Sequence, residues 1–434
     1  MLYLFLDNIR GFSRTVIPIE TVNFLVGENS TGKSSILALL NLLRSQEFWV
    51  NQNFNLSNYE FGGYRDILSA TANRNAKLSL GLYSTIRDEK NKKDNNYCYL
   101  LRFEEKDGLP VLQFFGRLDN SHLMSLKLAK GKDMFLSQEL PDLPFSNPNA
   151  MFDILLKETL RQLSRYRNFP KGMPSRKDNV PFFFIISMLE SFIKHKKLKN
   201  NELYFRYPFL APELVWFAPI RSKPKRTYDG YDLPFSPEGE HTPFLLRKKL
   251  NGAKNLNFRI AIEKFGKESG LFNKIVIKRL GKDAAAPFEL HIELTPHYPL
   301  RINSVGYGVS QILPLITEII LRERGCWFAI QQPEVHLHPR AQAALGDLIY
   351  HIAEAEGKKF IIETHSDFTI DRFRLNYKRD PQHKTKGQVL FFSRNEKGNN
   401  LSIIPFKEDG EYPENQPKEF RNFFLKEQMA LLNL

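Results

Sequence analysis

Apolar and polar positions follow strand and helix patterns at both ends of the chain. Near the N-terminus they predict short strands over residues 2–8 and 22–26, separated by a turn at 10–13. The second strand leads through a glycine-bearing loop into residues 34–43, where apolar side chains cover more than one face of a predicted buried helix. A strand, a loop and a buried helix in this order predict a βα unit of an α/β sheet.

After Leu245 the chain returns to the same kind of pattern. The predicted elements are a helix at 258–265, strands near 275–279 and 289–294, a helix from the glycine-rich segment 305–311 through Leu321, a strand at 327–330, a helix at 339–355 and a strand at 360–363. Strands that alternate with helices are typical of an α/β nucleotide-binding domain.

The region between these two halves has a different pattern. Strand-like alternation at 77–83 and 97–103 is followed by helical spacing over much of 150–206, and the prolines between Pro219 and Pro243 predict an irregular connection. We therefore predict an α/β domain with a mixed sheet, interrupted by a mainly helical insertion. The expected boundaries are 1–84 for its N-terminal half, 85–214 for a partly helical and basic insertion, 215–405 for its C-terminal half and 406–434 for a tail or helix.

Composition excludes several classes of protein. The chain has 434 residues, 42% hydrophobic and 25% charged, as in ordinary globular domains. It has only two cysteines, Cys98 and Cys326, so a disulfide framework is excluded and we expect a reducing cytoplasm. The longest apolar run, 181–189, is about half the length of a membrane-spanning helix, and the first residues lack a basic segment and a cleavage site. We expect neither a membrane segment nor a secretory signal.

The chain is basic, with 62 Lys and Arg against 48 Asp and Glu and a net charge of +14. Part of this excess is clustered in the insertion, at Lys157, Arg161, Arg165, Arg167, Lys171, Arg176, Lys177, Lys194, Lys196, Lys197 and Lys199. Such a cluster either forms a solvated face without a partner or attracts nucleic acid or an acidic protein surface. Both alternatives stay open, so nucleic acid is a candidate partner.

Residues 27–34 carry the strongest chemical signal. The segment Gly27-Glu28-Asn29-Ser30-Thr31-Gly32-Lys33-Ser34 has the full spacing G-x-x-x-x-G-K-S. The glycines let the backbone wrap a phosphate, Lys33 reaches the β- and γ-phosphates, and the Ser34 hydroxyl takes a place on Mg²⁺. The helix that follows directs its positive end at the same phosphates. The motif predicts a phosphate-binding loop.

Three further motifs are weaker when taken singly. Residues 305–311 place two glycines and Ser310 at a helix start, which favours anions. The strand at 327–330 ends in Gln331-Gln332-Pro333-Glu334, where a nucleotidase presents a carboxylate for Mg²⁺ and a base for water. The strand at 360–363 ends in Glu363-Thr364-His365-Ser366, where His365 is either structural or a γ-phosphate contact.

His336 and His338 lie between these last two motifs and could reach one metal ion from an extended segment. No cysteine and no third histidine lies close to them in the sequence, so a structural role is favoured over a metal site.

Together, and in this order, the motifs resemble the ATP-binding-cassette ATPases of the overcoming-lysogenization-defect type. This group of AAA family ATPases includes stand-alone bacterial anti-phage proteins. Residues 6–12 resemble the family's first strand and turn, Gly27–Ser35 its Walker A loop, 305–315 its signature, 330–339 its Walker B and D-loop region and 364–366 its switch histidine. The resemblance covers roughly residues 1–82 and 215–405.

The resemblance implies ATP and Mg²⁺ bound between two head-to-tail copies of the chain. The Walker A residues Lys33 and Ser34 of one copy would face Gly308, Ser310 and Gln311 of the other. ATP would hold the two copies together until hydrolysis separates them, in a homodimer or a higher oligomer.

The same resemblance assigns further roles around the nucleotide. Arg10 would lie over it, His365 would contact the γ-phosphate, and residues 334–338 would couple the two sites.

One departure from the family concerns hydrolysis. The family usually has two acidic residues where this chain has Gln331 and Gln332. An amide at Gln331 can still accept a hydrogen bond from a Mg²⁺-bound water, but Gln332 in the catalytic position cannot act as a general base. We predict slow turnover or an ATP-locked state, unless Glu334, Glu363 or a partner supplies the carboxylate.

The function implied is a nucleotide-dependent switch or sensor in bacterial anti-phage defence that controls a separate effector, a nuclease or toxin. Relatives with a fused nuclease carry it after the switch histidine. Only 68 residues (434 − 366) follow Ser366 here, and none forms an Asp-x-Asp pair, so we expect no nuclease in the same chain.

Three alternatives are weighed against this function. The chain could be a DNA repair or recombination ATPase that binds DNA through the basic insertion, or a non-hydrolysing ATP-dependent scaffold, which the two glutamines favour. A transporter subunit fits poorly, because its signature would read Leu-Ser-Gly-Gly-Gln.

Overall fold

The computed structural model describes residues 2–56, 59–73, 75–88, 93–129, 132–140, 143–171, 173, 181–197, 214–250, 255–283, 285–396 and 398–423. The chain divides into two compact units. Unit 1 comprises Met1–Glu20, Asn29–Ala211 and Phe392–Leu401, and unit 2 comprises Thr21–Glu28, Pro212–Phe391 and Ser402–Leu434.

A six-stranded sheet organises unit 2. Its strand order is β10 (Leu214–Phe217), β14 (Trp327–Gln331), β15 (Lys359–Glu363), β3 (Val22–Gly27), β16 (Gly387–Asn395) and β17 (Gly398–Pro405). The neighbours from β10 to β3 run parallel. Nearly every residue of β14, β15 and β3 is buried, which is why these strands read as continuous apolar runs instead of alternating patterns.

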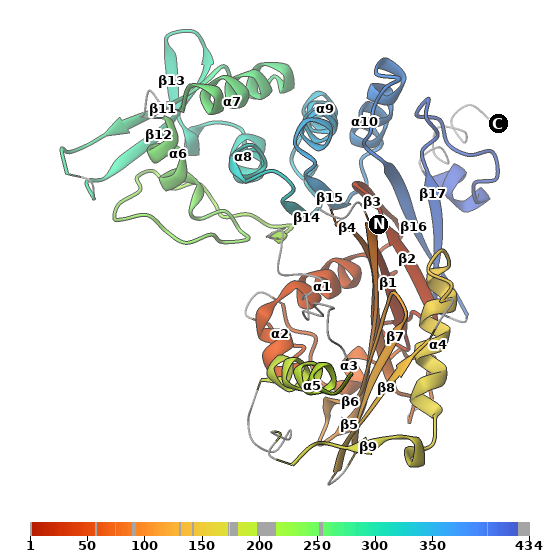
Figure 1. Ribbon diagram of the computed structural model, residues 1–434. Coiled ribbons are helices and arrows are strands. Elements are labelled where there is room, and N and C mark those ends of the chain that lie inside the picture. Colours follow the sequence, from red (N-terminus) through yellow and green to blue (C-terminus); the bar gives the residue numbers. More distant parts are fainter. Residues whose placement is uncertain are drawn as a thin grey trace. The chain divides into compact units, whose positions relative to one another are not determined.

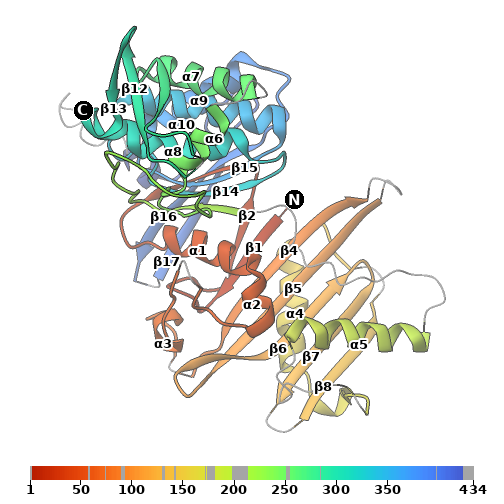
Figure 2. The same cartoon turned by 90° about the vertical axis from the view of Figure 1, so that its left-hand side faces the viewer.

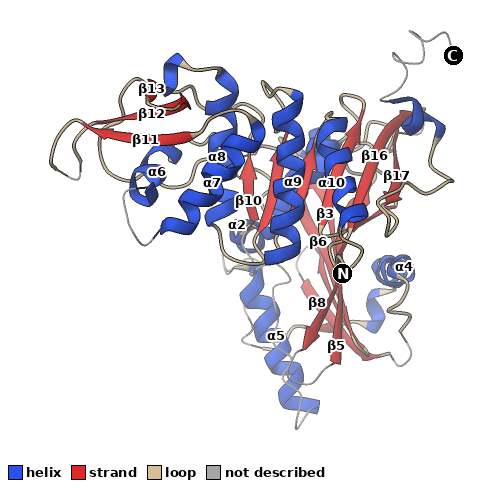
Figure 3. Ribbon diagram, turned by 90° about the horizontal axis from the view of Figure 1, so that it is seen from above, coloured by secondary structure: helices blue, strands red, loops and turns tan. Residues whose placement is uncertain are grey.

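The helices of unit 2 follow these strands in the chain. They are α6 (Thr242–Leu250), α7 (Leu256–Ser269), α8 (Tyr307–Leu321), α9 (Pro339–Glu356) and α10 (Asp367–Arg379), and α8, α9 and α10 lie alongside one another in Figure 3. A small antiparallel sheet, β11 (Lys274–Arg279), β12 (Phe288–Thr295) and β13 (Tyr298–Arg301), lies beside α6 and α7 (Figure 1). A short 3-10 helix, η4 (Ile302–Ser304), precedes α8. One large apolar core joins the helices and sheets of this unit.

Unit 1 is built on an eight-stranded antiparallel sheet (Figure 2). Its order is β2 (Thr15–Ile19), β1 (Leu2–Asp7), β4 (Leu78–Asp88), β5 (Lys93–Lys106), β6 (Leu109–Asp119), β7 (His122–Ala129), β8 (Lys132–Glu139) and β9 (Arg167–Asn168). The remaining elements are α1 (Lys33–Arg44), α2 (Gln46–Asn51), α3 (Tyr64–Ile67), α4 (Pro148–Leu160), the 3-10 helix η1 (Leu163–Arg165) and α5 (Phe182–Lys197).

Helices α4 and α5 cover opposite faces of this sheet (Figure 1). Phe152 of α4 stacks on Phe5 of β1 and belongs to the same cluster as Phe114, whereas Phe182 of α5 contacts Phe115 edge to face. Phe114 and Phe115 are neighbours in β6, and successive side chains of a strand point to opposite faces. The sheet is therefore apolar on both sides.

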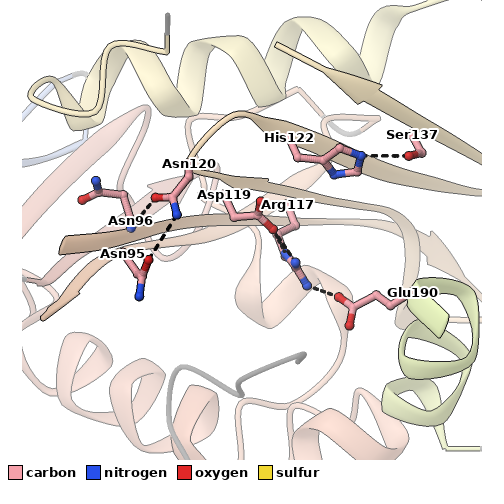
Figure 4. A network of polar contacts seen from close by, with 8 residues as sticks. All are labelled: Asn95, Asn96, Arg117, Asp119, Asn120, His122, Ser137 and Glu190. Carbon is pink, nitrogen blue, oxygen red and sulfur yellow. Dashed lines mark hydrogen bonds and ion pairs between the residues drawn. The ribbon is translucent and has the colours of Figure 1, made fainter. Parts of the chain in front are cut away.

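A buried ion network ties α5 to β6 (Figure 4). The Arg117 guanidinium donates to the carboxylates of Asp119 and Glu190, and all three side chains are less than a tenth exposed. The Asp119 carboxylate holds the pKa of Arg117 above its ordinary value, although burial alone would lower it. Removing one partner of such a network leaves an uncompensated buried charge, which costs about 3–5 kcal/mol.

The strand and helix positions predicted for the two halves are confirmed within one or two residues for most elements. They correspond to β1, β3, α1, α8, β14, α9 and β15, with α7, β11 and β12 longer than expected. Residues 218–241 carry neither helix nor strand apart from the isolated bridge of Tyr228 with Phe288, as the prolines predict. The elements not foreseen include β2, α6, α10, β16 and β17.

The prediction of a mainly helical insertion is wrong. Among the described residues of 85–214, strands β5 to β8 dominate, and only α4 and α5 are long helices. A tight two-residue hairpin turn joins β5 to β6, where Asp107 and Gly108 both have the positive φ that such a turn requires. The part of the helical prediction at 198–206 lies outside the described residues. Of the predicted tail, residues 418–423 are helical, and residues 424–434 lie outside the described residues.

We find no helix in the described part of the chain whose length and hydrophobicity would allow it to cross a bilayer.

Candidate functional site

Three parallel strands of unit 2 end at one edge of its sheet. In their register Gln331 of β14 lies opposite Glu363 of β15, which in turn lies opposite Leu25 of β3. The pairing continues beyond the strands, because the Gln332 N–H donates to the Glu363 carbonyl at 2.8 Å and the Thr364 N–H donates to the Leu25 carbonyl at 3.1 Å. The motifs after β14 and β15 therefore lie beside the point where β3 enters its glycine-bearing loop. Ligands of α/β sheets bind at this carboxyl edge.

The loop after β3 has the conformation that its sequence predicts. Gly27, Ser30 and Gly32 all have positive φ, and Gly32 precedes the first residue of α1 with φ 94°. Lys33 begins the helix, and its side chain is only 3% exposed. The strand, loop and helix predicted around Lys33 are confirmed as local structure. The phosphate contacts expected of residues 27–35 remain a prediction.

Gly32 also has a packing role within unit 1. A Cβ atom at this position would lie 2.6 Å from the Phe12 ring and 2.9 Å from Nδ2 of Asn399. Asn399 donates from Nδ2 to the Arg10 carbonyl at 2.8 Å, and Arg394 donates to the Ser30 carbonyl. The turn at residues 10–12 and the β16–β17 hairpin thus hold the loop. Nothing in the sequence near Arg394 or Asn399 indicates this contact.

Arg10 is held by residues of the same unit. Its Nη2 donates to the Phe61 carbonyl at 2.8 Å, and its guanidinium lies 5.6 Å from the centre of the Phe61 ring. Its Nε is buried without a hydrogen-bond partner in the described ranges. Its expected place over a nucleotide remains a prediction.

The glycine-rich start of α8 contacts the segment that follows β14. A Cβ on Gly308 would lie 2.6 Å from the His336 carbonyl oxygen, and the rings of Tyr307 and His336 meet edge to face at 5.0 Å. Ser310 is nearly buried, and its hydroxyl donates to the Tyr307 carbonyl at 2.8 Å. Because the glycine permits this close approach, two motifs that lie apart in the sequence form one surface of unit 2.

Arg221 is a site residue that the sequence analysis missed. It is 2% exposed, its N–H donates to Oε1 of Gln311 at 3.3 Å, and its Nη2 donates to the Gln331 carbonyl at 3.4 Å. Burial lowers the pKa of Arg221 to about 10, and the neighbouring Glu334 carboxylate opposes that shift. The residue lies in the irregular, proline-rich connection, so no periodic pattern could reveal it.

Several buried polar atoms around Arg221 have no hydrogen-bond partner among the described residues. They are Nε and Nη1 of Arg221, Nε2 of Gln311 and Oε2 of Glu334. Buried polar atoms are normally paired, because leaving one unpaired costs about 1–3 kcal/mol. A group of unpaired donors and an acceptor beside the edge of the sheet is typical of a site whose polar atoms become paired when a ligand binds or the conformation changes.

The carboxylates near this edge belong to Glu334 and Glu363. Glu334 accepts a hydrogen bond from the His365 N–H at 2.6 Å, and Glu363 accepts one from Nε2 of Gln331 at 3.4 Å. The second contact orients the Gln331 amide so that its oxygen points away from Glu363. The His365 side chain is exposed, with its ring 6.3 Å from that of Phe423.

The two histidines of the segment after β14 have separate structural contacts. His338 caps α9, accepting from the Arg340 N–H at 3.3 Å, whereas His336 packs against Tyr307. Within the described ranges no group of three or more His, Cys, Asp or Glu side chains could hold a metal ion.

The residues present fit a nucleoside triphosphate with Mg²⁺. The loop offers Lys33 and the N-terminus of α1 to phosphate, and the Ser34 hydroxyl is an oxygen ligand of the kind that Mg²⁺ prefers. In unit 2, Gln331 at the end of β14 offers an amide oxygen. The charge available to the metal is small, because Gln331 and Gln332 are neutral.

Comparison with known proteins agrees with this interpretation at a coarse level. Residues 244–370, which include α8, β14, α9 and β15, match the family described as AAA ATPase domain. The match supports an ATP-binding ATPase of the AAA type over these residues and implies that a nucleotide is the ligand. No curated protein matches the chain.

Solved structures with some likeness to the chain are heads of SMC proteins. An SMC head bound to the C-terminal winged-helix domain of ScpA has 11% identity and a TM-score of 0.43, covering 94% of this chain and 98% of that one. An SMC head with an extended coiled coil, bound to the C-terminal domain of ScpA and derived from Pyrococcus furiosus, has 12% identity and a TM-score of 0.41, covering 100% and 99%. The SMC head from Thermotoga maritima has 10% identity and a TM-score of 0.38, covering 93% and 98%. At these values the likeness carries no argument about function.

Proposed function

We propose that this chain is an ATPase whose two-copy assembly acts as a nucleotide-dependent switch and whose hydrolysis is slow. One observation carries the proposal: the register of β14, β15 and β3 brings the Gln331 and His365 motifs beside the strand that enters the phosphate loop. The match of residues 244–370 to the AAA ATPase domain supports the same nucleotide chemistry.

The loop would hold the triphosphate, and each of its residues has a distinct task. Backbone N–H groups of residues 29–34 and the Lys33 ammonium would bind phosphate oxygens, and the positive end of α1 adds to this attraction. Ser34 and Gln331 would hold Mg²⁺ directly or through water. When bound, Mg²⁺ neutralises charge that develops on the phosphates.

Slow turnover follows from the residues at the end of β14. Gln332 has no carboxylate with which to take a proton from water, and a positioned general base contributes about 10²–10⁴-fold to a rate. The buried guanidinium of Arg221 beside Gln331 adds positive charge where a metal prefers negative charge. We therefore expect the site at the carboxyl edge of the sheet to bind ATP without hydrolysing it rapidly.

The contacts within unit 2 also support a switch. Gly308 packs on the His336 carbonyl, and Glu334, two residues before His336, holds the His365 N–H. If a nucleotide on a second copy binds the start of α8 near Ser310, any shift of α8 acts on this short segment and through it on His365. A close-packed chain of contacts of this kind transmits a displacement because it cannot deform smoothly.

The biological role that we propose is a sensor in bacterial anti-phage defence that controls a separate effector, a nuclease or toxin. It rests on the resemblance of the motifs to the overcoming-lysogenization-defect ATPases. Co-expression of the chain with its genomic neighbours tests it: co-purification of a nuclease or toxin supports the role, and a neighbourhood of repair proteins without such an effector contradicts it.

A second candidate, a DNA repair ATPase, is favoured by exposed cations in unit 1. Lys157, Arg165, Arg167 and Lys171 are exposed around the end of α4 and β9, and Arg161 is partly exposed. The other basic residues of the predicted cluster have side chains outside the described residues. DNA binding that weakens steeply with salt, and that is lost in Arg165→Glu with Arg167→Glu, would favour this candidate.

ATP turnover and affinity test the main proposal. We expect Lys33→Ala to abolish binding of a fluorescent ATP analogue, and we expect the unaltered chain to hydrolyse ATP more slowly than about 1 s⁻¹, the low end of ordinary enzymes. The double variant Gln331→Asp with Gln332→Glu introduces both carboxylates and should raise turnover by about 10²-fold. ATP binding that survives in Lys33→Ala would sink the proposal.

A further inference from the structure

Unit 1 contains a cavity of about 300 Å³ that the nucleotide chemistry does not use. It lies on the face of the sheet that α4 covers, between strands β5 to β7 and the segment from the end of α4 to η1. Three of its lining side chains are cations, Lys77, Arg102 and Lys127, and no carboxylate is among the described residues that line it.

The sheet register places two of these cations in one row. Arg102 of β5 lies opposite Phe114 of β6, and Phe114 lies opposite Lys127 of β7. Residues directly opposite on antiparallel strands project from the same face, so Arg102 and Lys127 flank the Phe114 ring at the base of the cavity. Because neighbouring strands are about 4.8 Å apart, the two cations start from backbone positions about 10 Å apart. This spacing lets both side chains reach one small anion.

Among the described residues, neither cation of this row has a carboxylate as its hydrogen-bond or ion-pair partner. Arg102 donates from Nη1 to the neutral hydroxyl of Thr159, and its Nε is buried without a hydrogen-bond partner in the described part of the chain. Lys127 donates to the Arg161 carbonyl. Burial lowers the pKa of both Arg102 and Lys127, while the charges of Asp7 and Glu158, respectively, act against these shifts.

The carboxylates around the cavity have other partners, and Asp7 accepts from the Arg14 N–H at 3.2 Å. Glu158 accepts from the Tyr166 hydroxyl at 2.7 Å and pairs with Arg161 at 3.1 Å. Glu104 accepts from Gln113 and lies 3.6 Å from Lys77. An anion that entered the cavity would therefore meet Arg102 and Lys127 without displacing an internal ion pair.

The rim of the cavity is apolar and exposed. Leu160 is 79% exposed and Leu163 is 48% exposed, and both line the opening. When large apolar side chains lie exposed beside a cavity, a bound molecule that covers them removes apolar surface from water, which stabilises the complex. Cations at the base and leucines at the rim fit a molecule with a charged head and an apolar body.

We propose that this cavity binds a small organic anion, with a phosphate or carboxylate head on Arg102 and Lys127 and an apolar body against Leu160 and Leu163. The volume is at the lower end of small-ligand sites, so it suits a compact molecule and not a duplex nucleic acid. The site lies within unit 1 and does not depend on ATP.

Calorimetric titration of the full chain with octyl phosphate, octanoate and neutral octanol tests the proposal. We expect saturable one-to-one binding of octyl phosphate, octanoate or both, and none of octanol. Binding of both anions shows that any singly anionic head suffices, whereas binding of octyl phosphate alone assigns a phosphate head. Leu160→Asp places a like charge on an exposed rim position without disturbing the core, and it should weaken binding at least about tenfold.

Two double variants separate the cavity from diffuse surface charge. Arg102→Gln with Lys127→Gln should abolish binding, whereas the matched control Arg165→Gln with Arg167→Gln removes two exposed cations outside the cavity and should leave it unchanged. Equal binding of octanol, no binding at millimolar concentration, or equal loss in the control overturns the proposal. The proposal is also overturned if neither anion binds and a single-stranded oligonucleotide binds in a way that is lost in Arg102→Gln with Lys127→Gln. The site would then be a nucleic-acid surface.

Discussion

The backbone N–H of His365 donates to the carboxylate of Glu334 across 2.6 Å. His365 follows β15 and Glu334 follows β14, so this single bond joins the ends of two neighbouring parallel strands. The other carboxylate oxygen of Glu334 is buried without a hydrogen-bond partner among the described residues, and the charge of Glu334 acts on buried Arg221. One side chain thus both positions the His365 backbone and acts through its negative charge on that cation.

Two variants of Glu334 separate these tasks. Glu334→Gln keeps an oxygen that accepts from the His365 N–H, whereas Glu334→Ala leaves that N–H without its acceptor. We expect Glu334→Ala to lower ATP turnover about tenfold or more, because a small misplacement near a reacting phosphate is costly, and Glu334→Gln to stay within about threefold of the unaltered chain. Steady-state hydrolysis measures both. Equal losses would show that the charge of Glu334 matters and the positioning of His365 does not.

Two glycines at the start of α8 provide a matched pair. A Cβ at Gly308 would lie 2.6 Å from the His336 carbonyl oxygen, whereas nothing lies within 4 Å of a Cβ at Gly306. We expect Gly308→Ala to lower the free energy of unfolding by about 1–3 kcal/mol, the usual cost of overpacking, and to impair ATP-dependent dimer formation. Gly306→Ala should change neither. Chemical denaturation and sedimentation measure the two effects, and similar behaviour of the two variants would refute the close-contact argument.

Arg221 should contribute more to function than to stability. Its guanidinium is buried with two unpaired nitrogen atoms, and replacing a buried charge by an apolar side chain of similar length is often neutral or stabilising. We expect Arg221→Met to leave the free energy of unfolding unchanged or to raise it by about 1–2 kcal/mol while ATP turnover or affinity changes. The control Arg226→Met removes an exposed cation of the same segment. A loss of more than about 3 kcal/mol in Arg221→Met would mean that the residue is mainly structural.

Unit 2 should lose stability in acid through Glu318. Burial alone would raise the pKa of this carboxyl, but hydrogen bonds from His241 and Arg322 outweigh burial and lower it. A group whose pKa is lower in the folded state stabilises the fold above its unfolded value of about 4.3, and this contribution is lost as the pH falls through the folded value. Denaturation measured from neutral pH down to about pH 3 should show a smaller acid loss in Glu318→Gln than in the unaltered chain. The exposed Glu323→Gln should show the full loss.

The elements around the phosphate loop were predictable because their signals are local. Residues 22–27 and 33–44 carry continuous apolar runs on either side of a loop that needs glycine at positive φ, and both features can be recognised without knowledge of the fold. Of the insertion strands, the alternation at 97–103 was recognised and lies in β5, whereas β6 to β8 were not recognised, for a physical reason. Since α4 and α5 cover both faces of that sheet, strand β6 is buried at successive positions and loses the alternation that identifies a half-exposed strand.

The amino-acid sequence by itself determined the glycine-bearing loop between β3 and α1, the order of the motifs and the two neutral side chains at the end of β14, because each depends on residues that are neighbours in the chain. Only the tertiary structure decided that Arg221 lies beside Gln331, that Asn399 packs against Gly32 and that Arg102 and Lys127 share a cavity. These relationships depend on which strands pair and which side chains are removed together from water. The partners of a buried charge are the groups that strand packing brings near it, and these groups can be far apart along the chain.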